Sequence, residues 1–162
     1  MTRPRVLVVG GPNLNLVGLR EPARYGSQSM AAILADLADE AAGLGADLDC
    51  FQSNGEGALI DRIQAARTDG TAGLLVNLGG YTHTSVALRD ALLAVDLPFV
   101  EVHLSNIWAR EPFRHHSLIS DVAVGVVAGL GPVGYSLALR GLVHHLQLRN
   151  AAPSPMGELE PS

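Results

Sequence analysis

The sequence predicts an α/β fold, a doubly wound five-stranded parallel sheet between two layers of helices. Short apolar runs alternate with longer segments of helical periodicity, which is the pattern of successive βαβ units. The length of 162 residues suits one such domain. A (β/α)8 barrel is excluded because it needs about 250 residues.

The first predicted strand covers 5–9, because its apolar, β-branched residues are typical of a buried parallel strand. Two glycines and a proline end this strand and lead into a loop over 13–26, which has no sustained hydrophobic period. Ser27 or Ser29 can cap the first helix, which is expected to reach about Gly43 with apolar residues on one face.

The middle of the chain repeats this strand–helix unit. Strands are expected at 46–51, 73–78 and 98–104, each a short apolar run, and amphipathic helices at 56–67 and 84–95. Because crossovers between parallel strands are right-handed, consecutive units of this kind build one continuous sheet.

A fifth strand at 122–128 and a last helix at 132–148 complete a single domain over 1–150. The five strands match a flavodoxin-like, three-layer α/β/α domain. The polar, proline-containing tail at 151–162 is expected to lack structure.

Composition excludes several classes of function. The formal net charge is −5, which disfavours nucleic acid as a partner, and no apolar run reaches the ~18 residues that a membrane span requires. All eleven basic residues are arginine, so Schiff-base chemistry and a P-loop are excluded. The single cysteine, Cys50, lies in an apolar pattern; we expect a buried structural thiol rather than a nucleophile, in a reducing cytoplasm.

Neither a metal nor a nucleotide cofactor is predicted. The adjacent pairs His115-His116 and His144-His145 lack the i, i+4 spacing of helical metal ligands. The segment from Gly129 to Gly134 fits a dinucleotide-binding pattern, but no later strand carries the acidic residue that would hold a ribose. A tight turn with Pro132 opening the helix explains these glycines better.

Polar clusters follow three of the predicted strands, those at 5–9, 73–78 and 98–104. The carboxyl ends of parallel strands meet at one edge of the sheet, where such folds bind ligands. This convergence predicts a functional site, with candidate residues Asn13, Arg20 and Tyr25 after the first strand, Asn77 and His83 around the end of the third, and Glu101, His103 and Arg114 at and beyond the end of the fourth.

Tyr25 is a candidate base. The ordinary pKa of a phenol is ~10, and a cation within ~4–6 Å lowers it by roughly 1–3 units. Arg20 or Arg24 can supply that cation, and the resulting phenolate can take a proton beside a ketone. A tyrosine that packs over the loop is the alternative interpretation.

His103 is a candidate acid. Glu101 lies two residues earlier on the same strand face, where a carboxylate fixes the tautomer of a histidine and raises its basicity. Arg114 can pair with a carboxylate through two N–H groups. Asp90 comes seven residues after His83 and is expected on the same helical face, although a solvent-exposed charge explains it equally well.

Several strings of residues resemble the type II 3-dehydroquinate dehydratases (type II dehydroquinases), in that family's order and spacing over about 5–148. Two positions just before the matching string at 113–115 depart from the family: Trp108 stands where the family usually has histidine, and Pro112 where it usually has glutamate. The matching strings include Gly11-Pro12-Asn13-Leu14-Asn15, Arg20-Glu21-Pro22 through Tyr25-Gly26, Gln52-Ser53-Asn54, Tyr81-Thr82-His83-Thr84-Ser85, Glu101-Val102-His103 and Phe113-Arg114-His115.

The resemblance implies a cofactor-independent, reversible anti elimination of water from 3-dehydroquinate, which gives 3-dehydroshikimate through an enolate in the shikimate pathway to aromatic amino acids. It also implies a homododecamer, a tetramer of trimers. The implied catalytic residues are Tyr25 as the base, Arg20 as the support for its ionised form, Asn13 as the positioner of a water on the enolate oxygen, and His103 as the acid oriented by Glu101. The implied substrate-binding residues are Asn77, His83, Leu104, Ser105, Arg114 and, toward a neighbouring subunit's site, Asp90.

Three alternatives stay open at this point. The same elimination can serve quinate catabolism instead of biosynthesis. A non-catalytic flavodoxin-like module can bind a cyclic polyol acid without turnover. The third alternative is a protein that binds a flavin or a dinucleotide at the glycine-rich turn from Gly129 to Gly134.

Overall fold

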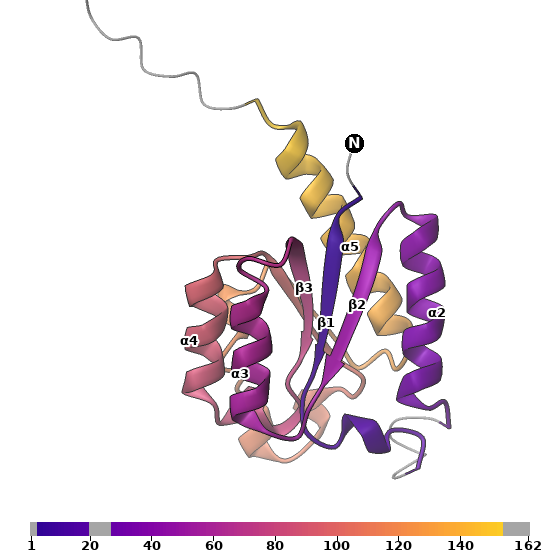
Figure 1. Cartoon of the computed structure of the whole chain (residues 1–162). Coiled ribbons are helices and arrows are strands. Elements are labelled where there is room, and N and C mark those ends of the chain that lie inside the picture. Colours follow the sequence, from indigo (N-terminus) through magenta and orange to yellow (C-terminus); the bar gives the residue numbers. More distant parts are fainter. Residues whose placement is uncertain (1–2, 20–26, 154–162) are drawn as a thin grey trace, which may run out of the picture.

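The five predicted strands form one parallel sheet in the order β2-β1-β3-β4-β5 (Figure 1). This is the flavodoxin-like order, in which the direction of winding changes between β1 and β3. The computed structural model describes residues 3–19 and 27–153. The strands are β1 (Arg5–Gly10), β2 (Asp47–Gln52), β3 (Thr71–Asn77), β4 (Phe99–His103) and β5 (Gly125–Ala128).

Helices cover both faces of the sheet, so the predicted three-layer arrangement is confirmed (Figure 1). One face packs against α2 (Met30–Gly43) and α5 (Val133–Ala151). The other packs against α3 (Glu56–Ala65) and α4 (Val86–Val95). Five short 3-10 helices connect these elements within the described residues: η1 (Leu14–Leu16), η2 (Gly79–His83), η3 (Ile107–Ala109), η4 (Pro112–Arg114) and η5 (Ser120–Val122).

The alternation of side chains along β1 divides the core in two. Val6 and Val8 pack in the cluster with α2 and α5, whereas Leu7 and Val9 pack in the cluster with α3 and α4. Successive strand residues point to opposite faces, and here both faces are covered, so the whole run is apolar.

Serine caps set the start of two helices. Ser29 Oγ accepts a hydrogen bond from Ala32 N at 3.1 Å, and Ser85 Oγ accepts one from Leu88 N at 3.0 Å. The helix expected from Thr84 therefore starts at Val86.

The expectation that His83 and Asp90 share a helical face is wrong. His83 lies in η2, and the cap at Ser85 separates this 3-10 helix from α4, which carries Asp90. The two side chains consequently belong to different elements.

Cys50 also departs from the sequence-based expectation, because it is exposed instead of buried. It lies on β2, which is an edge strand with a single neighbour, β1. Every residue of β2 is at least partly exposed, because helices cover the edge of the sheet less completely than its centre.

A close approach of two strand ends shapes the edge of the sheet near the predicted site. Gly11 N donates a hydrogen bond to Asn77 O at 2.8 Å. A Cβ atom at Gly11 would lie 2.2 Å from Leu78 O, so only glycine fits there.

Within the described ranges, no helix is both long and apolar enough to cross a membrane.

Candidate active site

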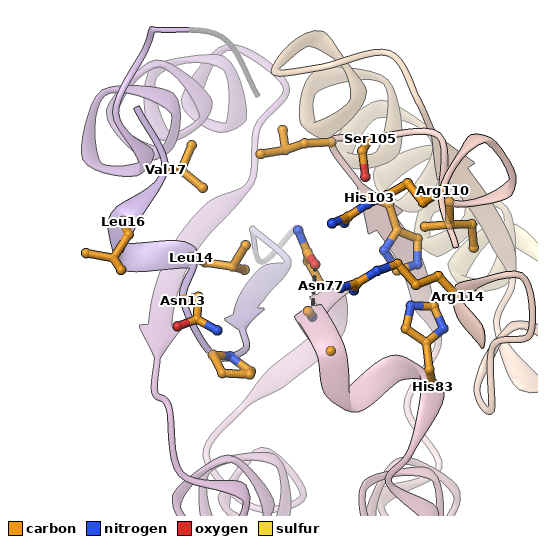
Figure 2. Close-up of a pocket in the computed structure, with 15 residues that line it drawn as sticks. Asn13, Leu14, Leu16, Val17, Asn77, His83, His103, Ser105, Arg110 and Arg114 are labelled. Carbon is orange, nitrogen blue, oxygen red and sulfur yellow. Dashed lines mark hydrogen bonds between the residues drawn. The ribbon is translucent and has the colours of Figure 1, made fainter. Parts of the chain in front are cut away.

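A cavity of about 160 Å³ lies at the carboxyl ends of β1, β3 and β4, where the sequence predicts convergence. Figure 2 shows an apolar side formed by Leu14, Leu16 and Val17 and, across the cavity, a polar side formed by histidine and arginine side chains. Of the predicted site residues, those that line it are Asn13, Asn77, His83, His103, Leu104, Ser105 and Arg114.

The other predicted residues lie elsewhere. Glu101 is not a lining residue; it is fully buried, 3.4 Å from His103. Asp90 is exposed on α4 and does not line the cavity of its own chain. Arg20 and Tyr25 lie outside the described residues.

Asn77 ends β3 with its side chain only 3% exposed. Its Oδ1 accepts a hydrogen bond from Gly79 N at 3.2 Å, and its Nδ2 donates one to the hydroxyl of Tyr135 at 3.0 Å (Figure 2 marks the contact with Gly79). Burial raises the pKa of Tyr135 to about 12, so this phenol stays neutral. The second N–H of the Asn77 amide is left to bind an oxygen in the cavity.

The pair Glu101 and His103 occupies the end of β4. The Nε2 atom of His103 lies 3.4 Å from Oε1 of Glu101, and both side chains are buried. Burial by itself would raise the pKa of Glu101, but the contact with His103 and the hydrogen bonds from Ser117 and Ser120 outweigh it and lower that pKa. Glu101 is therefore an ionised carboxylate beneath the imidazole.

His83 faces the cavity from η2. Its Nδ1 lies 2.8 Å from His116 O, and because a carbonyl only accepts, Nδ1 carries the proton. Burial lowers the pKa of His83, and the charge of Arg114 acts in the same direction, so the ring is neutral at pH 7. Its Nε2 can thus accept a hydrogen bond from a ligand hydroxyl. The ring stacks on that of His103, with centroids 6.4 Å apart.

Two arginines give the polar side of the cavity its positive charge. Arg114 Nε donates to Glu111 Oε2 at 2.6 Å, which fixes the guanidinium while its other N–H groups remain available. Arg110 lines the same side. Such a pair favours an anionic ligand, above all a carboxylate.

Asn13 is held in an unusual backbone conformation at the mouth of the cavity, with φ of 68°. Its N–H donates to Oδ1 of Asn54 at 3.0 Å, a residue that follows β2. Asparagine tolerates this left-handed region better than most residues, which explains the local sequence.

Sequence reasoning missed four polar residues of this region and the apolar side of the cavity. Arg110 lies within a predicted polar cluster, although the sequence analysis gave it no role. Tyr135 contacts Asn77 from α5, whereas Ser117 and Ser120 contact Glu101 from the loop after η4 and from the start of η5. No local spacing relates these three to their partners, so only the fold reveals them.

Comparison with known proteins places the chain in a family. The model of the family described as dehydroquinase class II matches residues 4–143. The 3-dehydroquinate dehydratase of Bordetella avium (strain 197N) is 59% identical over 140 residues, which cover 86% of this chain and 97% of the relative. That of Laribacter hongkongensis (strain HLHK9) is 62% identical over 136 residues, which cover 84% of this chain and 88% of the relative.

Solved structures agree with these relatives. The crystal structure of the type II dehydroquinase from Butyrivibrio crossotus DSM 2876 superposes with a TM-score of 0.85 at 40% identity, covering 88% of this chain and 99% of that chain. The type II dehydroquinase from Propionibacterium acnes gives a TM-score of 0.83 at 39% identity, with 88% and 98% covered. The chain belongs to the class II dehydroquinase family.

Proposed function

We propose that this chain is a cofactor-independent hydro-lyase, a 3-dehydroquinate dehydratase, that removes water from 3-dehydroquinate to give 3-dehydroshikimate in the shikimate pathway. The observation that carries the proposal is the buried pair of Glu101 and His103, of which His103 lines a cavity that also contains the guanidinium of Arg114. An acid and an anion-binding group in one small cavity suit a cyclic hydroxy acid.

Substrate binding uses the polar side of the cavity. The free N–H of Asn77 and the backbone of Leu104 and Ser105 can bind substrate oxygens, and Arg114 supplies a positive charge to a carboxylate. Neutral His83 accepts from a ring hydroxyl through Nε2. The apolar side formed by η1 and Val17 packs against the carbon skeleton.

The elimination proceeds in two steps. The Tyr25 phenolate takes the proton from C2, and the electron pair of that C–H bond forms an enolate on the ketone. Arg20 favours the phenolate by its charge. Asn13 positions a water against the enolate oxygen. Tyr25, Arg20 and Asn13 receive these roles from the family resemblance.

In the second step the enolate collapses and the C1–O bond breaks. The departing hydroxyl takes a proton from His103 and leaves as water, so atoms and charge balance. Glu101, whose carboxylate lies 3.4 Å from Nε2 of His103, orients the imidazole for this transfer.

The family resemblance also supports a homododecamer, a tetramer of trimers, located in the cytoplasm. In that assembly Asp90, which is exposed on α4, reaches the cavity of a neighbouring subunit. Light scattering of the purified protein tests the assembly. A monomer with full activity would contradict the role of Asp90.

The test of the function is a turnover assay without added metal or nucleotide, followed by the ultraviolet absorbance of the enone product. The wild type should turn over, whereas Tyr25→Phe should lose activity by orders of magnitude and still bind substrate. Ligand-dependent thermal stabilisation with no turnover in the wild type would instead identify a binding module. A requirement for an added cofactor would refute the proposed mechanism.

A further inference from the structure

A segment outside the cavity, made of the loop after η4 and the start of η5, supplies two serine hydroxyls to the buried carboxylate of Glu101. Ser117 Oγ donates to Oε1, and Ser120 Oγ donates to Oε2. Ser117 Oγ also accepts hydrogen bonds from the N–H groups of Ile119 and Ser120, both at 3.2 Å. Because these N–H groups occupy the acceptor positions of the hydroxyl, its proton points toward Glu101.

Both carboxylate oxygens of Glu101 therefore accept a hydrogen bond from a serine hydroxyl. Nε2 of His103 lies 3.4 Å from Oε1, is buried, and has no hydrogen-bond partner that satisfies the usual geometry within the described residues. An ionised Glu101 draws the ring proton onto Nε2. Proton exchange between His103 and a bound ligand then uses the other nitrogen, Nδ1.

We propose that Ser117 and Ser120 are positioning residues for the acid: together they hold Glu101 ionised and oriented, and Glu101 in turn fixes the tautomer of His103. This inference rests on the proposed role of His103 as the acid. The two serines do not line the cavity and act only through Glu101.

The loop is anchored on both sides, so the positions of the hydroxyls are determined by the fold. Leu118 N donates to Thr82 O at 2.9 Å, which ties the loop to η2. Arg89 of α4 donates to Leu118 O at 2.8 Å and pairs with Asp121 just after Ser120. A hydroxyl delivered from a fixed loop orients a carboxylate better than a water does, because its position is set in advance.

Few other charges act on Glu101. On its own strand the titratable neighbour is His103, and its register neighbours on β3 and β5 are the apolar Val76 and Val126. His83, on η2, interacts electrostatically with Glu101, whose negative charge acts to raise the pKa of His83. Around the loop, His116 and Asp121 are exposed, and Asp121 is paired with Arg89. Loss of the serine hydroxyls therefore leaves His103 as the main group that opposes the effect of burial.

The primary test is Ser120→Ala, because Ser120 donates to Glu101 whereas Ser117 also supports the loop backbone. We expect kcat to fall about tenfold with KM within about twofold, and the acid limb of the kcat profile to move up by about one pH unit. Ser120→Thr, which keeps the hydroxyl, should restore both. Ser136→Ala is the matched control, since Ser136 donates to Glu40 at 2.7 Å, outside the cavity.

Two further measurements separate positioning from a merely structural role. In a Glu101→Gln background, Ser120→Ala should cause no additional loss of kcat, because both changes act on one interaction. In the unliganded protein, the ¹⁵N signals of His103 should report the Nε2–H tautomer in the wild type and a mixture of tautomers in Ser120→Ala.

The proposal is overturned if Ser120→Ala keeps the wild-type kcat and acid limb. It is also overturned if the variant loses activity equally at every pH while the ¹⁵N signals of His103 stay unchanged. A wild type without turnover would refute the proposed function, but the ¹⁵N comparison would still test the effect of the serines on His103.

Discussion

Asn77 and Tyr135, 58 residues apart in the chain, are joined by a buried hydrogen bond of 3.0 Å from the side-chain amide to the phenol oxygen. The bond connects the end of β3 with α5, the helix that packs with α2 against one face of the sheet. Oδ1 of Asn77 also accepts a hydrogen bond from Gly79 N. The two bonds together fix the orientation of the amide, and one N–H of Nδ2 remains to bind a ligand.

Replacement of Tyr135 by phenylalanine should therefore weaken substrate binding. Without the phenol the Asn77 amide can rotate, and we expect KM to rise about three- to tenfold and the free energy of unfolding to fall by about 1 kcal/mol. Steady-state kinetics and urea unfolding measure the two effects. Tyr81→Phe is the control, since that hydroxyl donates to Asn54 O at 2.8 Å on the surface; an equal rise of KM in both variants would contradict the prediction.

Arg114→Lys should raise KM at least about tenfold, because a lysine presents one charge in place of the planar guanidinium. Glu111 already holds Arg114 at 2.6 Å, so the wild-type side chain is positioned before substrate arrives. Arg140→Lys is matched to it, with a contact of 2.6 Å from Nε to Glu40 and no place in the cavity. Unchanged KM in the Arg114 variant would remove this arginine from substrate binding.

Gly11→Ala should disturb both the fold and the cavity. A methyl group at this position would lie 2.2 Å from Leu78 O, so the ends of β1 and β3 must separate. We expect a loss of about 1–3 kcal/mol in the free energy of unfolding, accompanied by weaker substrate binding.

The control for this change is Gly57→Ala in α3, where an added methyl meets no atom within 4 Å. That variant should be more stable than the wild type by about 0.5–1 kcal/mol, because alanine is the better helix former. Thermal melting of the two variants decides the matter; equal melting temperatures would contradict the steric argument.

Much of the fold could be predicted from the sequence, because the strands and α-helices carry strong hydrophobic periods. A buried parallel strand such as β1 is apolar from Val6 to Val9, and amphipathic helices separate the strands along the chain. The 3-10 helices were missed, since three to five residues carry no period. That omission led to the wrong placement of His83 and Asp90 on one helical face.

The site was predictable where its residues end strands. Asn77 and His103 stand at the carboxyl ends of β3 and β4, so topology alone brings them together. Tyr135, Ser117 and Ser120 could not be predicted in the same way, because they contact the site through packing from a helix and a loop. The exposure of Cys50 was missed because the sequence does not reveal which strand lies at the edge.

The stability of the unliganded protein should decrease as the pH falls through about 6.5, partly because of His83. Burial lowers the pKa of His83 in the folded state, whereas in the unfolded chain it titrates near its ordinary value of ~6.5. Below that value the unfolded chain binds more protons than the folded one, so protonation favours unfolding. The contribution of neutral His83 is complete above the unfolded pKa and is lost on the acid side.

Urea unfolding of the wild type and of His83→Gln, at neutral and at mildly acidic pH, isolates this contribution. The variant lacks the half-buried imidazole, so its urea midpoint should depend less on pH than that of the wild type, even if the midpoint is lower at both pH values. His144→Gln, an exposed position on α5, should keep the wild-type dependence. The same pH dependence in wild type and His83→Gln would show that His83 is not the group that titrates, and its neutral form in the cavity would then lose its support.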